Sequence, residues 1–589
     1  MARKPVIFVP GLCGSFNLLV LLDVQGPRLT GWNFPPFITY GKHFLEAFER
    51  AGYVRDRDLF VAFYDWRKSI QDAARLYLKP WIDRAKRRAS ADKVILVGHS
   101  MGGLVARSYI QSSDYADDVA RLFTLGTPHR GAGEAYYAWG GGELRSDPAV
   151  KTVFDVYLWY LRHAHPFQTQ LDPLRTIRTQ VPGLRDLLPI DNYLINHLGP
   201  PLPRPETSHR ERNRVGLMLN QPAQLELLAR RVPVTTIRAT GFPTIRAIVV
   251  GGPPIPPGDP PRFPDGEPVH DEVDHEGDGT VRSASAALEH WNINNLGPLS
   301  GTGHGVLPDH PEVLRLVFEE LRSTEEPDLP VPPPGALPVE ETKLVVLTAS
   351  PVTMVVETPA GPPLRGTGVL GAPVEVLGAP ARPRRVRARD HGHGGKHLNI
   401  AVISNPPAGA YRVHLHGTAT GSLALGAMLV GAEPVPVLGA VEGAGEVMAA
   451  QTRYTEISTV HGQVANGTDL FYEVIVTDIR TPPDVHLDAR ATAADAMAKL
   501  RAATGGGDIP GAARVAEVLG QAPPGVREAA EVVLGGDVAA TEAALEILGG
   551  AEPATMADAL TVVARDVVGA QDVALAEALI VQLQALKTG

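Results

Sequence analysis

One serine lies in a sequence context that makes it a candidate nucleophile. Ser100 is the centre of Gly98-His-Ser-Met-Gly102, between the apolar run 94–97 and an apolar stretch that begins at Leu104. A strand that enters Gly-x-Ser-x-Gly and leaves as a helix is typical of a nucleophile elbow, a tight turn that exposes the serine hydroxyl. The positive end of the following helix would favour the negative charge that develops there. The pattern therefore predicts acyl-transfer chemistry at Ser100.

A serine hydroxyl needs a base and an orienting acid, which follow the elbow in the order acid, then histidine. Asp278 lies in the glycine turn 277–279, and His304 lies between two glycines at 303 and 305. His310 precedes a proline at an apparent helix start, where capping is expected, and His275 precedes the acid and breaks the order. We predict a triad of Ser100, Asp278 and His304. The glycine-flanked turn selects Asp278 over four neighbouring acids, Asp271, Glu272, Asp274 and Glu276.

Two backbone N–H groups are expected to bind the oxyanion. One belongs to Met101, the residue after the nucleophile, and the other to Leu12, in the loop 9–14 that follows the first expected strand. The loss of one such donor typically costs about 2.7–4 kcal/mol of transition-state stabilisation.

The elements that must position these residues predict an α/β fold. Short apolar runs alternate with amphipathic stretches between residues 5 and 322, and the expected core strands are 6–9, 59–63, 93–97, 122–125 and 245–250. This alternation is typical of a mainly parallel sheet with helices on both faces, here an α/β-hydrolase core over residues 1–325. Residues 131–232 break the rhythm and are expected to form a helical cap over the active site.

The composition changes beyond residue 325. Residues 326–340 are rich in proline and acid, which indicates a semi-rigid linker. Residues 341–482 hold short alternating runs between Gly, Pro and Asn turns, which predicts an all-β sandwich module. Residues 488–589 show helical periodicity between Gly-Gly and Pro breaks, which predicts an α-helical module.

Composition narrows the function classes. The 589 residues carry a net charge of -10, which argues against a nucleic-acid binder. The single cysteine, Cys13, excludes an intrachain disulfide and a cysteine-built zinc site, and no metal or nucleotide cofactor is expected. No signal peptide or membrane span is recognised, so we expect a soluble, cytoplasmic protein.

Together these motifs resemble the lecithin:cholesterol acyltransferase-like family of α/β-hydrolases, which includes phospholipases and acyltransferases. The resemblance implies the triad and the oxyanion donors named above. It also implies that Tyr64, Asp65, Trp66 and Arg67 line or support the acyl pocket, although an aromatic strand end packed under the cap, with Asp65 paired to Arg67, explains them equally well. The matching pieces lie within residues 1–320, in the family's order: Phe8-Val-Pro-Gly11, Tyr64-Asp-Trp-Arg67, Gly98-His-Ser-Met-Gly102, Leu125-Gly-Thr-Pro-His129, Leu187-Leu-Pro189, Gly277-Asp-Gly-Thr-Val281 and Gly303-His304.

The sequence thus predicts a serine carboxyl-ester hydrolase of lipid acyl esters, such as a phospholipase, lipase or esterase, that meets its substrate at a membrane surface. Acyl transfer to an alcohol would use the same triad. A third hypothesis is an interaction or targeting protein, in which residues 341–589 bind a protein partner or self-associate and thereby control the hydrolase.

Overall fold

The computed structural model describes residues 3–21, 28–38, 40–145, 148–164, 172–198, 203–252, 261–331, 342–359, 367–368, 385–387, 389–390, 398–436, 448–464, 466–467, 469–477 and 481–488. They form two compact units, one made of residues 1–161, 170–341 and 432–453 and the other of the remainder. The predicted helical module and most of the predicted linker lie outside the described residues. Among those that are described, no helix is both long and apolar enough to cross a membrane.

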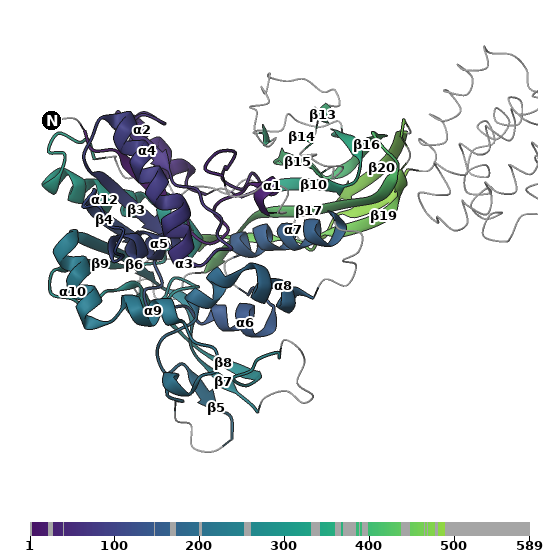
Figure 1. Cartoon of the computed structure of the whole chain (residues 1–589). Helices are drawn as coiled ribbons and strands as arrows, with labels where there is room; N and C mark the ends of the chain where they lie inside the picture. The colour runs from purple at the N-terminus through teal and green to yellow at the C-terminus, as the bar shows by residue number, and fades with distance from the viewer. Residues whose placement is uncertain are drawn as a thin grey trace, which may run out of the picture. The chain divides into compact units, whose positions relative to one another are not determined.

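A six-stranded sheet is the centre of the first unit (Figure 1). Every neighbouring pair in it is parallel, in the order β2-β1-β3-β4-β6-β9. Strands β1, β3 and β4 are almost entirely buried, as expected where helices cover both faces of a parallel sheet. The strands are β1 (Val6–Val9), β2 (Leu59–Val61), β3 (Val94–His99), β4 (Val119–Leu125), β6 (Val234–Thr240) and β9 (Ile293–Ser300).

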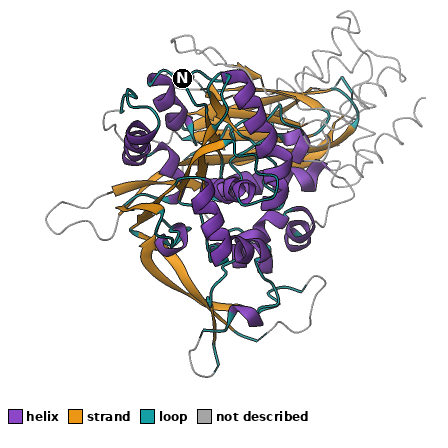
Figure 2. Cartoon of the chain, turned by 60° about the vertical axis from the view of Figure 1, so that its left-hand side comes forward, coloured by secondary structure: helices purple, strands orange, loops and turns teal. Residues whose placement is uncertain are grey.

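Helices pack against this sheet, which confirms the predicted α/β class (Figure 2). Phe8 of β1 contacts Phe44 of α2 (Lys42–Arg50), and Phe48 of α2 contacts Phe318 of α12 (Pro311–Thr324) with ring centroids 4.6 Å apart. A second group packs around α5 (Met101–Ile110), which contacts β3 and β4. Its other members are α3 (Ile70–Ala73), the π-helix η1 (Ala74–Leu78), α4 (Lys79–Ala89) and α10 (Pro222–Arg231).

The insertion between β4 and β6 is mainly helical where it is described, as predicted for these residues. It also contains a short strand, β5 (Leu194–Asn196), which the sequence did not indicate. Its helices are α6 (Glu134–Gly141), α7 (Pro148–Ala164), α8 (Pro173–Gln180), η2 (Pro182–Leu187), η3 (Glu206–Ser208), α9 (Arg214–Leu219) and α10.

One predicted core strand is wrong. Residues 245–250 belong to β7 (Phe242–Val250), which pairs with β5 and with β8 (Pro268–Gly277) in a separate three-stranded sheet. The central sheet uses β6 at this place, and β6 begins just after residue 232, where the predicted cap ends. Both runs are apolar and β-branched, so local pattern cannot tell which of them pairs with β4.

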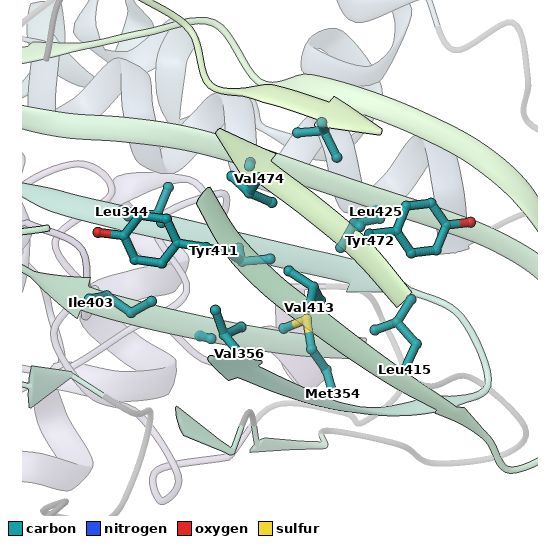
Figure 3. Close-up of a cluster of buried hydrophobic side chains, with 14 of the residues drawn as sticks. Leu344, Met354, Val356, Ile403, Tyr411, Val413, Leu415, Leu425, Tyr472 and Val474 are labelled. Carbon is teal, nitrogen blue, oxygen red and sulfur yellow. The ribbon is translucent and has the colours of Figure 1, made fainter. Parts of the chain in front are cut away.

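The described strands between 343 and 487 form two antiparallel sheets, which confirms the predicted all-β class. One sheet has the order β12-β15-β10-β17-β18, with β14 and β19 paired to β15 and β17, and the other has the order β13-β11-β16-β20-β21. Side chains of both sheets meet in one apolar core that includes Leu344, Met354, Val413 and Tyr472 (Figure 3). The predicted boundary at 482 is too early, because β21 pairs with β20. The strands are β10 (Lys343–Ala349), β11 (Val352–Glu357), β12 (Thr367–Gly368), β13 (Arg385–Arg387), β14 (Arg389–Asp390), β15 (Leu398–Ser404), β16 (Gly409–Gly417), β17 (Gly421–Pro436), β18 (Met448–Tyr454), β19 (Ser458–Val464), β20 (Asp469–Val476) and β21 (Asp484–Leu487).

Candidate active site

The sequence-predicted site residues all lie beyond the carboxyl edge of the central sheet. Leu12 follows β1, the segment 64–67 follows β2, and Ser100 and Met101 follow β3. His304 follows β9, at the start of the 3-10 helix η4 (His304–Asp309). Because parallel strands place their carboxyl ends at one edge, residues far apart in the sequence meet at that edge.

The turn at Ser100 has a strained backbone. Its φ of 51° and ψ of -127° lie outside the regions that a side chain favours. The glycines around it permit close contacts: a Cβ on Gly98 would lie 2.6 Å from Cα of Gly103, and one on Gly102 would lie 2.2 Å from the carbonyl oxygen of Val9. The Ser100 N–H donates to the carbonyl of Leu125 at 2.9 Å. The surrounding structure therefore holds the serine in a conformation that it would not adopt alone.

Asp278 reaches the end of β6 through the β7–β8 hairpin. The hairpin leaves the sheet after Thr240 and returns where Phe242 bridges Asp278, so the excursion begins and ends at the same place. The Oδ1 atom of Asp278 accepts from the N–H groups of Val281 (2.7 Å) and Thr280 (3.1 Å). These two bonds orient the carboxylate and leave Oδ2 for another partner.

His304 lies between the serine and the acid. Its Nδ1 is 2.8 Å from Oδ2 of Asp278, and its Nε2 is 2.9 Å from Oγ of Ser100. Since a carboxylate oxygen only accepts, Nδ1 carries the proton and Nε2 accepts the hydrogen bond of the serine hydroxyl. The His304 N–H also donates to the Asp278 carbonyl at 2.9 Å, and all three side chains are buried. The arrangement can remove a proton from Ser100 and stabilise the resulting imidazolium.

The two predicted oxyanion donors have no acceptor. Among the described residues, the N–H groups of Leu12 and Met101 make no hydrogen bond. The loop that holds Leu12 is closed by the Gly14 N–H, which donates to the carbonyl of Gly11 at 3.0 Å. Gly183 of η2 lies beside Met101, since a Cβ on this glycine would lie 2.9 Å from the Met101 Cε atom. The insertion therefore contacts the edge of this site.

Tyr64 and Trp66 are buried and direct their polar atoms at the loop after β1. The Tyr64 hydroxyl donates to the carbonyl of Pro10 at 2.9 Å, and the Trp66 indole N–H donates to the carbonyl of Ser15 at 3.0 Å. The Trp66 ring contacts Tyr157 of α7 edge to face. Tyr64 thus fixes the loop after β1, and Trp66 links the segment that follows this loop to α7 of the insertion.

Asp65 and Arg67 form a buried ion pair. The guanidinium donates to both carboxylate oxygens at 2.9 Å, and it also donates to the carbonyls of Val20 (3.0 Å) and Leu21 (2.8 Å) at the end of α1 (Leu18–Leu21). Burial disfavours the charge on Arg67, but the bonds and the charge of Asp65 outweigh it and raise the pKa of Arg67. The polar atoms of this pair bond to each other and to the backbone of α1. The pair is therefore better suited to support the site than to contact a substrate.

The alternative histidines His310 and His275, and His129 of the Leu125–His129 motif, are not part of the triad. His310 caps α12, as predicted, by accepting the N–H of Glu312, and His275 lies in β8. His129 accepts from the buried Arg107 at 3.1 Å, and burial, followed by the Arg107 charge, lowers the pKa of His129. His129 therefore links the segment after β4 to α5 and is not part of the triad.

Sequence reasoning missed Tyr40 and Asp309. Both are buried, and Asp309 accepts the N–H groups of Gly41 (2.6 Å) and Phe44 (2.9 Å) at the start of α2. No local motif marks either residue, because their partners lie far away in the sequence.

Part of this sequence is similar to known proteins. The family model of lecithin:cholesterol acyltransferase matches residues 37–153, which include the segment 64–67 and the serine elbow. This part of the chain is similar to the lecithin:cholesterol acyltransferase-like α/β-hydrolases. A GPI inositol-deacylase of Emericella nidulans is 29% identical over 144 residues, and the phospholipase A(1) LCAT3 of Arabidopsis thaliana is 33% identical over 91 residues.

These matches are partial. The first covers 21% of this chain and 12% of the deacylase, and the second covers 15% of this chain and 20% of the phospholipase. Among solved structures, the mature lipase BlEst2 of Bacillus licheniformis is 18% identical with a TM-score of 0.28, covering 54% of this chain and 92% of the lipase. The phospholipase PlaB of Legionella pneumophila is 11% identical, with a TM-score of 0.28, covering 70% of this chain and 86% of that one.

Proposed function

We propose that the protein is a serine carboxyl-ester hydrolase whose substrates are lipid acyl esters. The observation that carries this proposal is the continuous hydrogen-bonded series from Oγ of Ser100 through His304 to Asp278. Next to it are the N–H groups of Leu12, in the loop after β1, and of Met101, at the start of α5, and neither makes a hydrogen bond among the described residues.

The proposed reaction has two halves. Ser100 Oγ attacks the acyl carbonyl carbon while its proton passes to Nε2 of His304, and Asp278 stabilises the charged imidazole. The N–H groups of Leu12 and Met101 donate to the oxyanion. The tetrahedral intermediate collapses, the ester C–O bond breaks, and the leaving alkoxide takes the proton from His304. Water, activated by the same imidazole, then releases the acid from the acyl-serine.

The similarity to an inositol-deacylase and to a phospholipase supports a lipid acyl ester as the substrate class. An alcohol in place of water at the second step would make the same site an acyltransferase, since the triad serves both acceptors. The nature of the product therefore decides between the two.

The test uses the full chain and mixed vesicles of phospholipid, triglyceride and sterol, with lipid mass spectrometry as the readout. Ser100→Ala removes the nucleophile, and Ser323→Ala, at an exposed site on α12, is the matched control. Free fatty acid and lysolipid should appear with the unmodified protein and the control but not with Ser100→Ala. Acylated sterol would assign transfer instead. Equal products from Ser100→Ala would overturn the proposed nucleophile, and no product from any protein would overturn the lipid assignment.

A further inference from the structure

Behind the serine elbow, Tyr40 and His99 form a second hydrogen-bonded series. The Tyr40 hydroxyl lies 2.8 Å from Nδ1 of His99 and accepts the N–H of Gly11 at 2.8 Å. The other ring nitrogen of His99, Nε2, lies 3.0 Å from the carbonyl oxygen of His304. Tyr40 and His99 are both buried, and their ring centroids lie 5.5 Å apart.

The direction of every bond in this series is determined. A carbonyl oxygen only accepts, so Nε2 of His99 must carry a proton and donate to His304. In the neutral ring Nδ1 is then an acceptor, and the Tyr40 hydroxyl donates to it. The hydroxyl oxygen in turn accepts from Gly11. The donors and acceptors therefore run in one direction, from the N–H of Gly11 to the Tyr40 hydroxyl, from this hydroxyl to Nδ1 of His99, and from Nε2 of His99 to the carbonyl of His304.

His99 remains neutral in this environment. Burial, and then the nearby charge of His304, lower the pKa of His99 well below its usual value. A proton on Nδ1 would remove the acceptor that Tyr40 needs. Neutrality thus preserves the direction of the series while His304 gains and loses its proton.

The two ends of the series lie beside the proposed catalytic groups. Gly11 precedes Leu12, whose N–H is the proposed oxyanion donor, and a Cβ on Gly11 would lie 2.9 Å from the Ser100 Cβ atom. His304 is the proposed base. The Gly41 N–H, next to Tyr40, is held by Asp309 at the end of η4, the same helix that begins at His304. The segment at 40–41 is thus joined to both loops.

We propose that Tyr40 and His99 are positioning residues that couple the loop 9–14, which holds the Leu12 N–H, to the loop that holds His304. This inference rests on the proposed function. Neither side chain needs to touch the substrate. Their hydrogen bonds set the distance between the Leu12 N–H and the base, and displacements of about 1 Å at such groups can lower rates by about 100-fold.

The decisive variant is Tyr40→Phe, which deletes only the hydroxyl. The ring contacts of Tyr40 with Phe8 and Phe34, at centroid distances of 6.0 and 5.5 Å, can remain. We expect kcat, expressed per competent site (a serine site that a fluorophosphonate can label), to fall about 10- to 100-fold. KM should stay nearly unchanged, because the lost interaction stabilises the transition state. Affinity for a boronic acid, which forms a tetrahedral adduct with the serine, should fall by a similar factor.

The second variant is His99→Gln, and the matched control is Tyr109→Phe. Tyr109 is also buried, and its hydroxyl donates to Asp118 beside the amino end of β4, away from the site. The double variant Tyr40→Phe/His99→Gln should be no slower than the slower single variant, since the series acts as one unit. Tyr109→Phe should keep the unmodified kcat per competent site.

The number of competent sites is counted by complete labelling with a fluorescent fluorophosphonate, so that misfolded molecules do not enter kcat. A fall in labelled sites alone, with unchanged kcat and boronate affinity, would overturn the positioning role. Multiplicative losses in the double variant would also overturn it. Absence of both labelling and hydrolysis in the unmodified protein would instead overturn the proposed function.

Discussion

The buried pair of Asp65 and Arg67 offers a sharp test of how the segment after β2 supports the site. Arg67→Met removes two bonds to Asp65 and two to the carbonyls of Val20 and Leu21. The exposed fractions of Asp65 and Arg67 are 1% and 3%, so water cannot replace the lost partner. Removal of one partner of such a pair typically costs about 3–5 kcal/mol, because the other charge remains buried and uncompensated.

The same reasoning predicts the sign of a double-variant effect. Asp65→Asn in the Arg67→Met background removes the uncompensated charge, so the double variant should be more stable than Arg67→Met alone by about 1–3 kcal/mol. Asp65→Asn by itself should cost about 1–3 kcal/mol, because the guanidinium keeps the two carbonyl acceptors.

The assay is urea unfolding of the full chain, followed by tryptophan fluorescence. All six tryptophans lie between residues 32 and 291, so the signal reports the first unit alone. A double variant that is less stable than Arg67→Met would refute the argument, because the two side chains would then contribute independently. A cost below about 1 kcal/mol for Arg67→Met would mean that the pair is hydrated in solution.

Three further predictions concern single residues. Gly102→Ala would place a Cβ 2.2 Å from the Val9 carbonyl oxygen, so α5 must move away from β1. We expect the free energy of unfolding in urea to fall by about 1–3 kcal/mol and most of the ester hydrolysis to be lost. Unchanged activity would contradict the close contact. Burial and then Asp271 raise the pKa of Glu134 from 4.5 to about 7, so the native state keeps a proton that the unfolded chain loses. The free energy of unfolding should therefore fall as the pH rises from 4.5 to 7. Glu134→Gln should raise the free energy of unfolding by about 1–3 kcal/mol at pH 8 and leave it unchanged at pH 4. Equal effects at the two pH values would contradict this assignment. Burial raises the pKa of the Cys13 thiol, so this thiol should react with a thiol reagent only after unfolding in urea. Rapid labelling of the native protein would show that the loop around Cys13 is open.

Much of the site could be predicted because its signals are local. The conformation at Ser100 depends on glycines within a few residues of it, and the acid turn and the histidine turn are marked in the same way. The all-β class of residues 343–487 also follows from alternation along single strands. The acid was harder to choose among five carboxylates, and the geometry that distinguishes Asp278 is the return of β8 to the end of β6.

What the sequence by itself determined is the set of chemical groups and their order: an elbow serine, a glycine-flanked acid, a late histidine and the alternation of strands with helices. Only the tertiary structure decided which apolar run joins the central sheet, since 234–240 and 245–250 have similar composition and differ in their pairing partners. It also decided that the Tyr40 hydroxyl bonds to His99 and that Arg67 bonds to the carbonyls of α1. Hydrogen bonds between distant segments depend on the path of the whole chain, and no local pattern of residue types records that path.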